Sequence, residues 1–387
     1  MSVKEGSSFG FVDRLEALRG VAALAVSVGH SMIWLVIGQE TALATKAIWE
    51  VRGIQATIAR AILSVFSGAA AVDIFFVLSG FVLTMSFFGK PLTINRYLMF
   101  AGKRVFRILP TLWFALLIVC LYLWTIYPGH AEFLGASDWF THSYQDPLSI
   151  KEVAENARLA AWSLDPNAWT LKVELLASAL LPLMVYAMGQ RGKTGTVLVF
   201  MVTLLLGWLR RDAQFNVIHY LYMFVIGAAI AKHGAKELAR FQPGNSGIVG
   251  CLIAILAASI CFPLWHPFGA DLLVVAGSAG LIWAISSGKE GSLLCILDAR
   301  WARFLGRISY SFYLLHFIVL YAVGNMFLHV VPTYFVLRQP LTVMLASCVL
   351  SIGIAIPIAA FAFRFIEKPF TLLGRQLLRP RSELSRA

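Results

Sequence analysis

The clearest chemical signal in the sequence is an arginine and a histidine, Arg19 and His30, on the first apolar segment. Eleven helical residues turn through about 1100°, which is three full turns with roughly 20° left over. Both side chains therefore lie on one face of a helix, about 16 Å apart along its axis. An ionisable group inside an apolar helix is costly and is a functional candidate by default. The pair suggests a path for a charged, elongated substrate, although a chance pair would show the same spacing.

An aspartate within the second apolar segment is the next candidate. Asp73 begins the run DIFFVLSGF, which ends in Ser79, Gly80 and Phe81. A carboxylate buried in lipid requires a partner, which favours a functional role for Asp73. Ser79 and Gly80 have a simpler interpretation, as a small-residue patch that lets two helices approach closely.

Three basic residues, Lys103, Arg104 and Arg107, stand at the expected cytoplasmic start of the third apolar segment. The two arginines are three residues apart and share one helix face. Their planar guanidinium groups suit a bidentate grip on phosphates better than a lysine does. Ordinary anchoring of a helix at the cytoplasmic surface is the competing interpretation.

A glutamate in the fourth segment is expected at the depth of His30. Glu174 lies about 8 Å deeper than Trp169, the first residue of WTLKVE, by helical rise. His30 lies about 20 Å along its own span, hence about 10 Å from the far edge of a 30 Å hydrocarbon core. A carboxylate beside an imidazole orients its tautomer and raises its basicity. We therefore predict that Glu174 orients His30 as a general base, with Asp73 as the reserve carboxylate; Trp169 could be an interfacial anchor.

Two further motifs lie near the end of the chain. GRISYSFYLLH at 306–316 contains Ser309, Tyr310 and His316, and RFIEKP occupies 364–369. The first could supply only interfacial aromatic residues and a packing histidine. In the second, Arg364 and Glu367 could pair with each other at the cytoplasmic surface.

Composition determines the class of protein that must position these residues. Hydrophobic residues make up 59% of the 387, charged residues 13%, and the mean hydropathy is +0.77, whereas soluble domains carry about 25% charged residues. These values predict an all-α, polytopic integral membrane protein. The basic residues behind the net charge of +12 are scattered between apolar segments, so we expect no nucleic-acid partner.

About ten transmembrane helices are expected, because ten apolar runs are long enough to cross a bilayer. They cover residues 17–38, 61–88, 108–127, 169–188, 195–209, 215–231, 247–264, 270–287, 307–330 and 340–363. We expect residues 1–369 to form one transmembrane domain and residues 370–387 to form a basic cytoplasmic tail.

Lysine and arginine number 23 in one set of alternate connections and 8 in the other. The positive-inside rule then predicts that both termini are cytoplasmic. The longest connection, about 128–168, would lie outside and could recognise a substrate or simply cover the membrane surface. The five cysteines form no CxxC or Cys/His cluster, so neither a metal site nor a disulfide framework is expected.

Taken in order along the chain, six motifs resemble acyltransferase family 3, a family of integral-membrane O-acyltransferases. They are Arg-x10-His at 19–30, DIFFVLSGF at 73–81, Arg-x-x-Arg at 104–107, WTLKVE at 169–174, GRISYSFYLLH at 306–316 and RFIEKP at 364–369. The resemblance implies transfer of an acyl group, most often acetyl, from acyl-coenzyme A to a hydroxyl of a carbohydrate or similar acceptor. It implies His30 as the catalytic centre, Arg19 as its motif partner, and Arg104 and Arg107 beside Lys103 as donor-binding residues.

On this resemblance we expect a multi-pass O-acetyltransferase of the bacterial inner membrane that modifies a cell-surface polysaccharide or glycolipid. Acetyl-coenzyme A would be its donor substrate, with no permanently bound cofactor. The expected catalytic residues are His30, Glu174, Arg19 and Asp73, and the supporting residues are Ser79, Gly80, Phe81, Trp169, Ser309, Tyr310 and His316. The alternative is a transporter in which the intramembrane ionisable residues form a proton or anion path.

Overall fold

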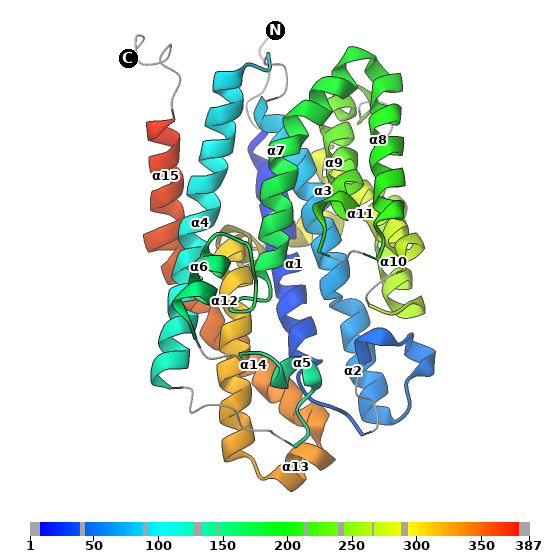
Figure 1. Cartoon of the computed structure of the whole chain (residues 1–387). Helices are drawn as coiled ribbons and strands as arrows, with labels where there is room; N and C mark the ends of the chain where they lie inside the picture. The colour runs from blue at the N-terminus through cyan, green and yellow to red at the C-terminus, as the bar shows by residue number, and fades with distance from the viewer. Residues whose placement is uncertain are drawn as a thin grey trace.

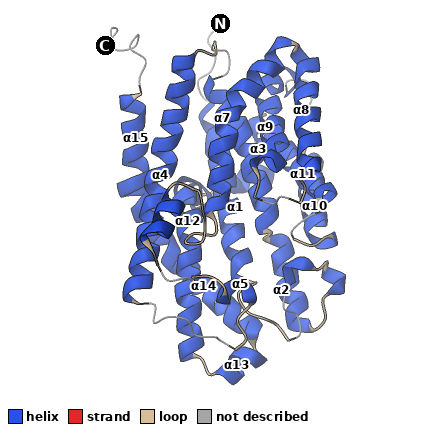
Figure 2. Ribbon diagram, viewed as in Figure 1, coloured by secondary structure: helices blue, strands red, loops and turns tan. Residues whose placement is uncertain are grey.

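The structure, a computed structural model, describes residues 8–38, 43–87, 91–126, 134–144, 148–212, 215–238, 244–264, 267–287 and 293–378. These residues form a bundle of helices (Figure 1), and among them the sole β contact is one isolated bridge between Leu35 and Ala136. Figure 2 shows that loops connect the helices without any strand in the part of the chain described. The predicted all-α class is confirmed.

Twelve longer helices form the body of the bundle in the described residues. They are α1 (Ser8–Ser31), α2 (Ile54–Val65), α3 (Gly68–Phe87), α4 (Ile94–Thr125), α7 (Ala168–Gln190), α8 (Gly192–Leu209), α9 (Val217–Leu238), α10 (Asn245–Cys261), α11 (Phe268–Ser286), α12 (Arg300–Val330), α14 (Pro340–Ala362) and α15 (Lys368–Leu377). Short helices connect them: α5 (Asp138–Thr141), α6 (Ile150–Ala157), α13 (Thr333–Arg338), three 3-10 turns at Leu43–Thr45, Ile48–Glu50 and Leu293–Asp298, and a π turn at Phe363–Glu367.

Eight helical segments of the described chain are long and apolar enough to cross a membrane. They are Ile54–Phe87, Ile94–Thr125, Ala168–Gln190, Gly192–Leu209, Val217–Gly234, Phe268–Ser286, Arg300–Val330 and Pro340–Leu377. The other two predicted spans correspond to α10, a shorter apolar helix, and to α1, which carries Arg14, Glu16 and Arg19 in its first half. A polytopic membrane protein is thus confirmed.

The third span begins earlier than the sequence indicated. It was expected at residue 108, but α4 begins at Ile94, where the Thr93 hydroxyl accepts a hydrogen bond from the Arg96 N–H and so caps the helix. Arg104 and Arg107 consequently lie within the helix and not at its start. The start of α4 could not be predicted from the run of apolar residues, because polar and basic residues occupy its first turns.

Helix α1 runs through the middle of the bundle and packs against α12 and α3 (Figure 1). Gly20 of α1 and Gly306 of α12 make the first contact possible, because a Cβ on either residue would overlap the backbone of the other helix. Gly80 does the same where α3 meets α9 at Phe224. Gly80 therefore serves helix packing, the simpler of its two interpretations.

The start of α1 and the end of α15 lie at one end of the bundle, and α5 and α13 lie at the other (Figure 1). Within the long connection predicted at 128–168, α5 covers the end of α1 and α6 packs on α4. The first residues of the predicted basic tail belong to helix α15, which packs on α4; residues 379–387 lie outside the described residues.

Candidate functional site

His30 lies in the last turn of α1, with its ring against His316 of α12. Nδ1 of His30 is 3.1 Å from Nε2 of His316. Nδ1 of His316 is in turn 2.7 Å from the carbonyl oxygen of Tyr313. Trp139 of α5 covers the His30 ring, with the two ring centroids 5.1 Å apart. His30 therefore belongs to a chain of two imidazoles that ends on a backbone carbonyl.

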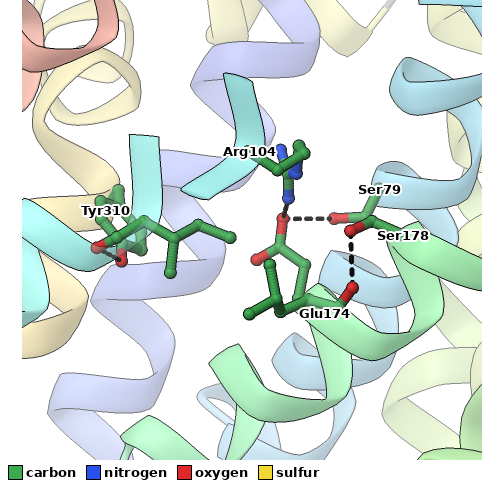
Figure 3. A network of polar contacts seen from close by, with 7 residues as sticks. Ser79, Arg104, Glu174, Ser178 and Tyr310 are labelled. Carbon is green, nitrogen blue, oxygen red and sulfur yellow. Dashed lines mark hydrogen bonds and ion pairs between the residues drawn. The ribbon is translucent and has the colours of Figure 1, made fainter. Parts of the chain in front are cut away.

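The expected pairing of Glu174 with His30 is wrong. Glu174 of α7 instead forms an ion pair with Arg104 of α4, and the Ser79 hydroxyl donates to the same carboxylate oxygen at 3.5 Å (Figure 3). Helical rise predicts only the depth of a residue, and it says nothing of which neighbouring helix a side chain faces. His316, expected only as a supporting residue, takes the place assigned to Glu174.

This ion pair belongs to a cluster of three arginines and two carboxylates. The positive charges of Arg104, Arg107 and Arg19 all act on Glu174. The positive charges of Arg107 and Arg19 also act on Glu367. The Glu367 carboxylate accepts a hydrogen bond from the Ser311 hydroxyl at 2.7 Å. The cluster retains one positive charge in excess, so it favours an anion.

Arg364 and Glu367, which could have paired with each other, face different neighbours. Glu367 is buried and faces α12, whereas the Arg364 guanidinium lies over the Phe365 ring, 5.6 Å from its centroid. A π turn at Phe363–Glu367 separates the two side chains, because its wider winding changes the angle between residues three apart.

A narrow pocket of about 60 Å³ opens onto this cluster, and we call it the basic pocket. Arg19 and Arg107 supply its positive charge, and Arg19 Nε donates to the Ser309 hydroxyl at 2.9 Å. Its wall also includes Phe75, Ser79, Thr170, Glu174, Ser309, Tyr310 and Tyr313. The Tyr310 hydroxyl donates to the carbonyl of Ile108 at 2.8 Å (Figure 3). Lys103 does not line the pocket.

A second and larger cavity of about 530 Å³ lies on the α5 side, and we call it the aromatic cavity. His30, Asp73 and Trp169 line it together. The other lining side chains include Trp139, Trp162, Asn167, Phe215, His219, Tyr220 and Asp271. Tyr313 borders both spaces, so the basic pocket and the aromatic cavity meet at this residue.

Of the expected supporting residues, Trp169 lines a cavity and Phe81 is part of the hydrophobic core. The Trp169 ring lies between Tyr220 and Phe215, with centroids 5.6 and 5.1 Å away, and forms part of the aromatic cavity wall. Phe81 is buried in the hydrophobic core and lines neither space. Trp169 is therefore part of the site, and Phe81 supports packing.

A buried carboxyl at the loop before α7 is connected to the imidazole chain. Asp165 accepts a hydrogen bond from the Asn167 backbone N–H at 3.0 Å, and the Asn167 side-chain amide donates to the Tyr313 carbonyl at 3.3 Å. Burial raises the pKa of Asp165 to about 7, although the hydrogen bonds from Asn167 act in the opposite direction.

Sequence reasoning missed His219, Asp271 and Asp165. His219 and Asp271 lie in the first turns of α9 and α11, where single polar residues look like ordinary interfacial residues. Their common feature, a place beside Asp73 in one cavity, exists only after folding. Within the described residues, no group of three or more His, Cys, Asp or Glu could hold a metal ion.

The comparison with known families agrees with this arrangement. A family model described as an acyltransferase domain, that of acyltransferase family 3, matches residues 12–360. No curated protein and no solved structure matches the chain. The match includes both the His30–His316 chain and the arginine cluster up to Glu174, and it favours an enzyme over a transporter. The chain belongs to acyltransferase family 3 and is a membrane-embedded acyltransferase.

Proposed function

We propose that the protein is an O-acyltransferase that moves an acyl group, in the simplest case acetyl, from acyl-coenzyme A to a carbohydrate hydroxyl. The observation that carries the proposal is the position of His30. Its ring is oriented by His316 and lines a cavity large enough for an acceptor, next to an arginine-lined pocket suited to a polyanionic donor.

The hydrogen bonds determine which nitrogen of His30 can act as a base. A carbonyl oxygen only accepts, so Nδ1 of His316 carries a proton and Nε2 of the neutral ring is an acceptor. The contact of 3.1 Å then requires Nδ1 of His30 to donate to that nitrogen. Nε2 of His30 is left with its lone pair, which can take a proton from a hydroxyl.

The reaction then has a simple balance. The acceptor hydroxyl oxygen attacks the thioester carbonyl carbon, a C–O bond forms, and the C–S bond breaks. The hydroxyl proton passes to Nε2 of His30 and from there to the departing coenzyme A thiolate. His316 stabilises the positive charge that His30 carries in between. The same nitrogen could instead accept the acyl group first, and a trapped acyl-imidazole would identify that two-step route.

The donor is assigned to the basic pocket. Its phosphates would be attracted by the excess positive charge of Arg19, Arg104 and Arg107. Because Arg104 is already paired with Glu174, we assign the main contacts with the donor to Arg19 and Arg107. The positive-inside count of 23 against 8 supports a cytoplasmic location for the chain ends, hence donor entry from the cytoplasm of a bacterial cell.

Comparison of cell-surface glycans with and without the gene tests the proposal. Mass analysis should find O-acetyl groups in cells that carry the gene and not in cells that lack it, and a gene encoding His30→Gln should not restore them. The matched control is His142→Gln, a change of an exposed histidine in the same outer region that lines neither space. Full restoration by the His30 variant would contradict the proposal.

A further inference from the structure

Two carboxylates from different helices share one wall of the aromatic cavity. Asp73 belongs to α3 and Asp271 to the first turn of α11, and the charge of Asp271 acts on Asp73. Nε2 of His219 from α9 lies 3.7 Å from Oδ2 of Asp271. All three residues line the same cavity as His30. None of them has a part in the proton transfer described above.

Among the described residues, some polar atoms of this group have no hydrogen-bond partner. Asp73 is 5% exposed and His219 is 6% exposed. Oδ2 of Asp73 and Nδ1 of His219 have no hydrogen-bond partner among the described residues. Buried polar groups are nearly always paired, so such exceptions need an explanation.

Charge differs between the two substrate spaces. Among the described residues, the acidic side chains that line the aromatic cavity are Asp73, Asp138 and Asp271, and the lining includes one arginine, Arg211. That guanidinium lies over the Trp208 ring, 5.1 Å from its centroid. A cavity with an excess of one sign of charge attracts the opposite sign and repels its own. An ionised carboxylate accepts hydrogen bonds only, so a matching ligand must bring donors, either hydroxyl groups or an ammonium group.

The remaining wall offers flat aromatic faces. Trp169 and Trp162 both pack against Phe215, with centroids 5.1 and 5.4 Å away, and Trp139 lies beside His30. Such faces accept the apolar side of a ring-shaped ligand and attract cations. A cavity of about 530 Å³ falls within the usual range for small-molecule sites.

We infer that Asp73 and Asp271 form an acceptor subsite that selects by charge. It holds a ring-shaped unit that is uncharged or carries an ammonium group, through hydrogen bonds to the two carboxylates, and it excludes units that carry a carboxylate or phosphate. This inference rests on the proposed function and adds the charge class of the acceptor.

The test uses purified full-length protein, acetyl-coenzyme A and three oligosaccharides of equal length, built from neutral hexose, hexosamine or uronate units. The neutral and amino acceptors should be used with kcat/KM at least about tenfold above that of the uronate. Asp73→Asn and Asp271→Asn should raise the KM for the neutral acceptor about tenfold, leave the KM for acetyl-coenzyme A unchanged, and reduce the discrimination against the uronate. Glu155→Gln, a change of an acidic residue of α6 that does not line the cavity, should change none of these values.

Equal use of the uronate by the wild type would overturn the inference, as would an Asn variant that changes only the KM for acetyl-coenzyme A. Binding of each oligosaccharide to the wild type, followed by tryptophan fluorescence, gives the same comparison without relying on folded variants. Equal affinity for all three would also overturn it. Failure of the wild type to acetylate any of the three would reject the proposed function, and the inference with it.

Discussion

The basic pocket and the aromatic cavity border the same tyrosine, Tyr313, yet they differ in size, charge and hydrogen bonding. The basic pocket is narrow and positively charged, and several of its polar side chains are already paired with one another. The aromatic cavity is about nine times larger and more acidic, and two of its lining residues, Asp73 and His219, have buried polar atoms without a hydrogen-bond partner in the described part of the chain. The difference is what we expect if the two proposed substrates, a polyanionic donor and a bulkier hydroxyl compound, occupy separate spaces.

Removing the acceptor nitrogen of His316 should have the largest effect of the variants outside His30. His316→Phe should lower kcat by about 10²- to 10³-fold, because Nδ1 of His30 loses the partner that orients it. His316→Gln keeps an acceptor oxygen and should recover about tenfold of this loss. Both KM values should stay within about twofold of the wild type. A large change in either KM, with kcat retained, would show that His316 serves binding and not orientation.

Changes of the basic pocket should affect the donor alone. Arg19→Gln and Arg107→Gln should each raise the KM for acetyl-coenzyme A about tenfold, as expected for loss of one charge-assisted hydrogen bond. The KM for the acceptor should not change. Lys103→Gln is the matched control, because Lys103 is a neighbouring cation that lines neither space. An equal effect of the control would mean that overall charge, and not the pocket, attracts the donor.

How far the sequence predicts these two spaces depends on where their residues lie in the chain. Helical geometry correctly placed Arg19 and His30 along α1, and the motifs supplied most residues of the basic pocket. Helical geometry gave the wrong partner for Glu174, because the depth of a residue in the membrane does not determine which helix its side chain faces. The partner of His30 is 286 residues away, a contact that no local pattern encodes.

The aromatic cavity was less predictable than the basic pocket. His219 and Asp271 are single polar residues at helix starts, and the connections that bring them together have no motif of their own. The fold class was easier, because apolar length and composition alone require membrane-spanning helices. The start of α4 was predicted too late in the chain, because basic residues occupy the first turns of this helix.

Asp165, beside the aromatic cavity, should make stability depend on pH. Burial raises its pKa to about 7 in the folded protein, above the value of about 3.9 expected in the unfolded chain. The folded state therefore binds the proton more tightly, and the stability contributed is fully present below about pH 4 and lost as pH rises through about 7, with an upper limit of about 4 kcal/mol. Thermal unfolding of Asp165→Asn in detergent should lack this loss. A wild type whose stability rises between pH 5 and pH 8 would contradict the assignment.

Asp298, at the opposite end of the bundle, should show the smallest effect and the opposite sign. Its hydrogen bonds from Arg14 hold the pKa of the carboxyl below its usual range. Its stabilising contribution is present above about pH 4 and is lost as pH falls through the lower folded value. Because the Asp298 side chain is 43% exposed, Asp298→Asn should cost less than about 1 kcal/mol at pH 7. Thermal unfolding at pH 7 and at pH 3 measures the difference, and a larger loss at pH 3 would contradict the sign.

The most direct test of the account is transfer by purified His30→Gln protein. The variant should bind acetyl-coenzyme A with a Kd within about twofold of the wild type, because the donor phosphates are assigned to the basic pocket. Acetyl transfer to the acceptor in a single turnover should fall by at least about 10³-fold, because the hydroxyl loses its base. His142→Gln should match the wild type in both measurements. Transfer by His30→Gln at a rate close to that of the wild type would contradict the central claim that His30 activates the acceptor.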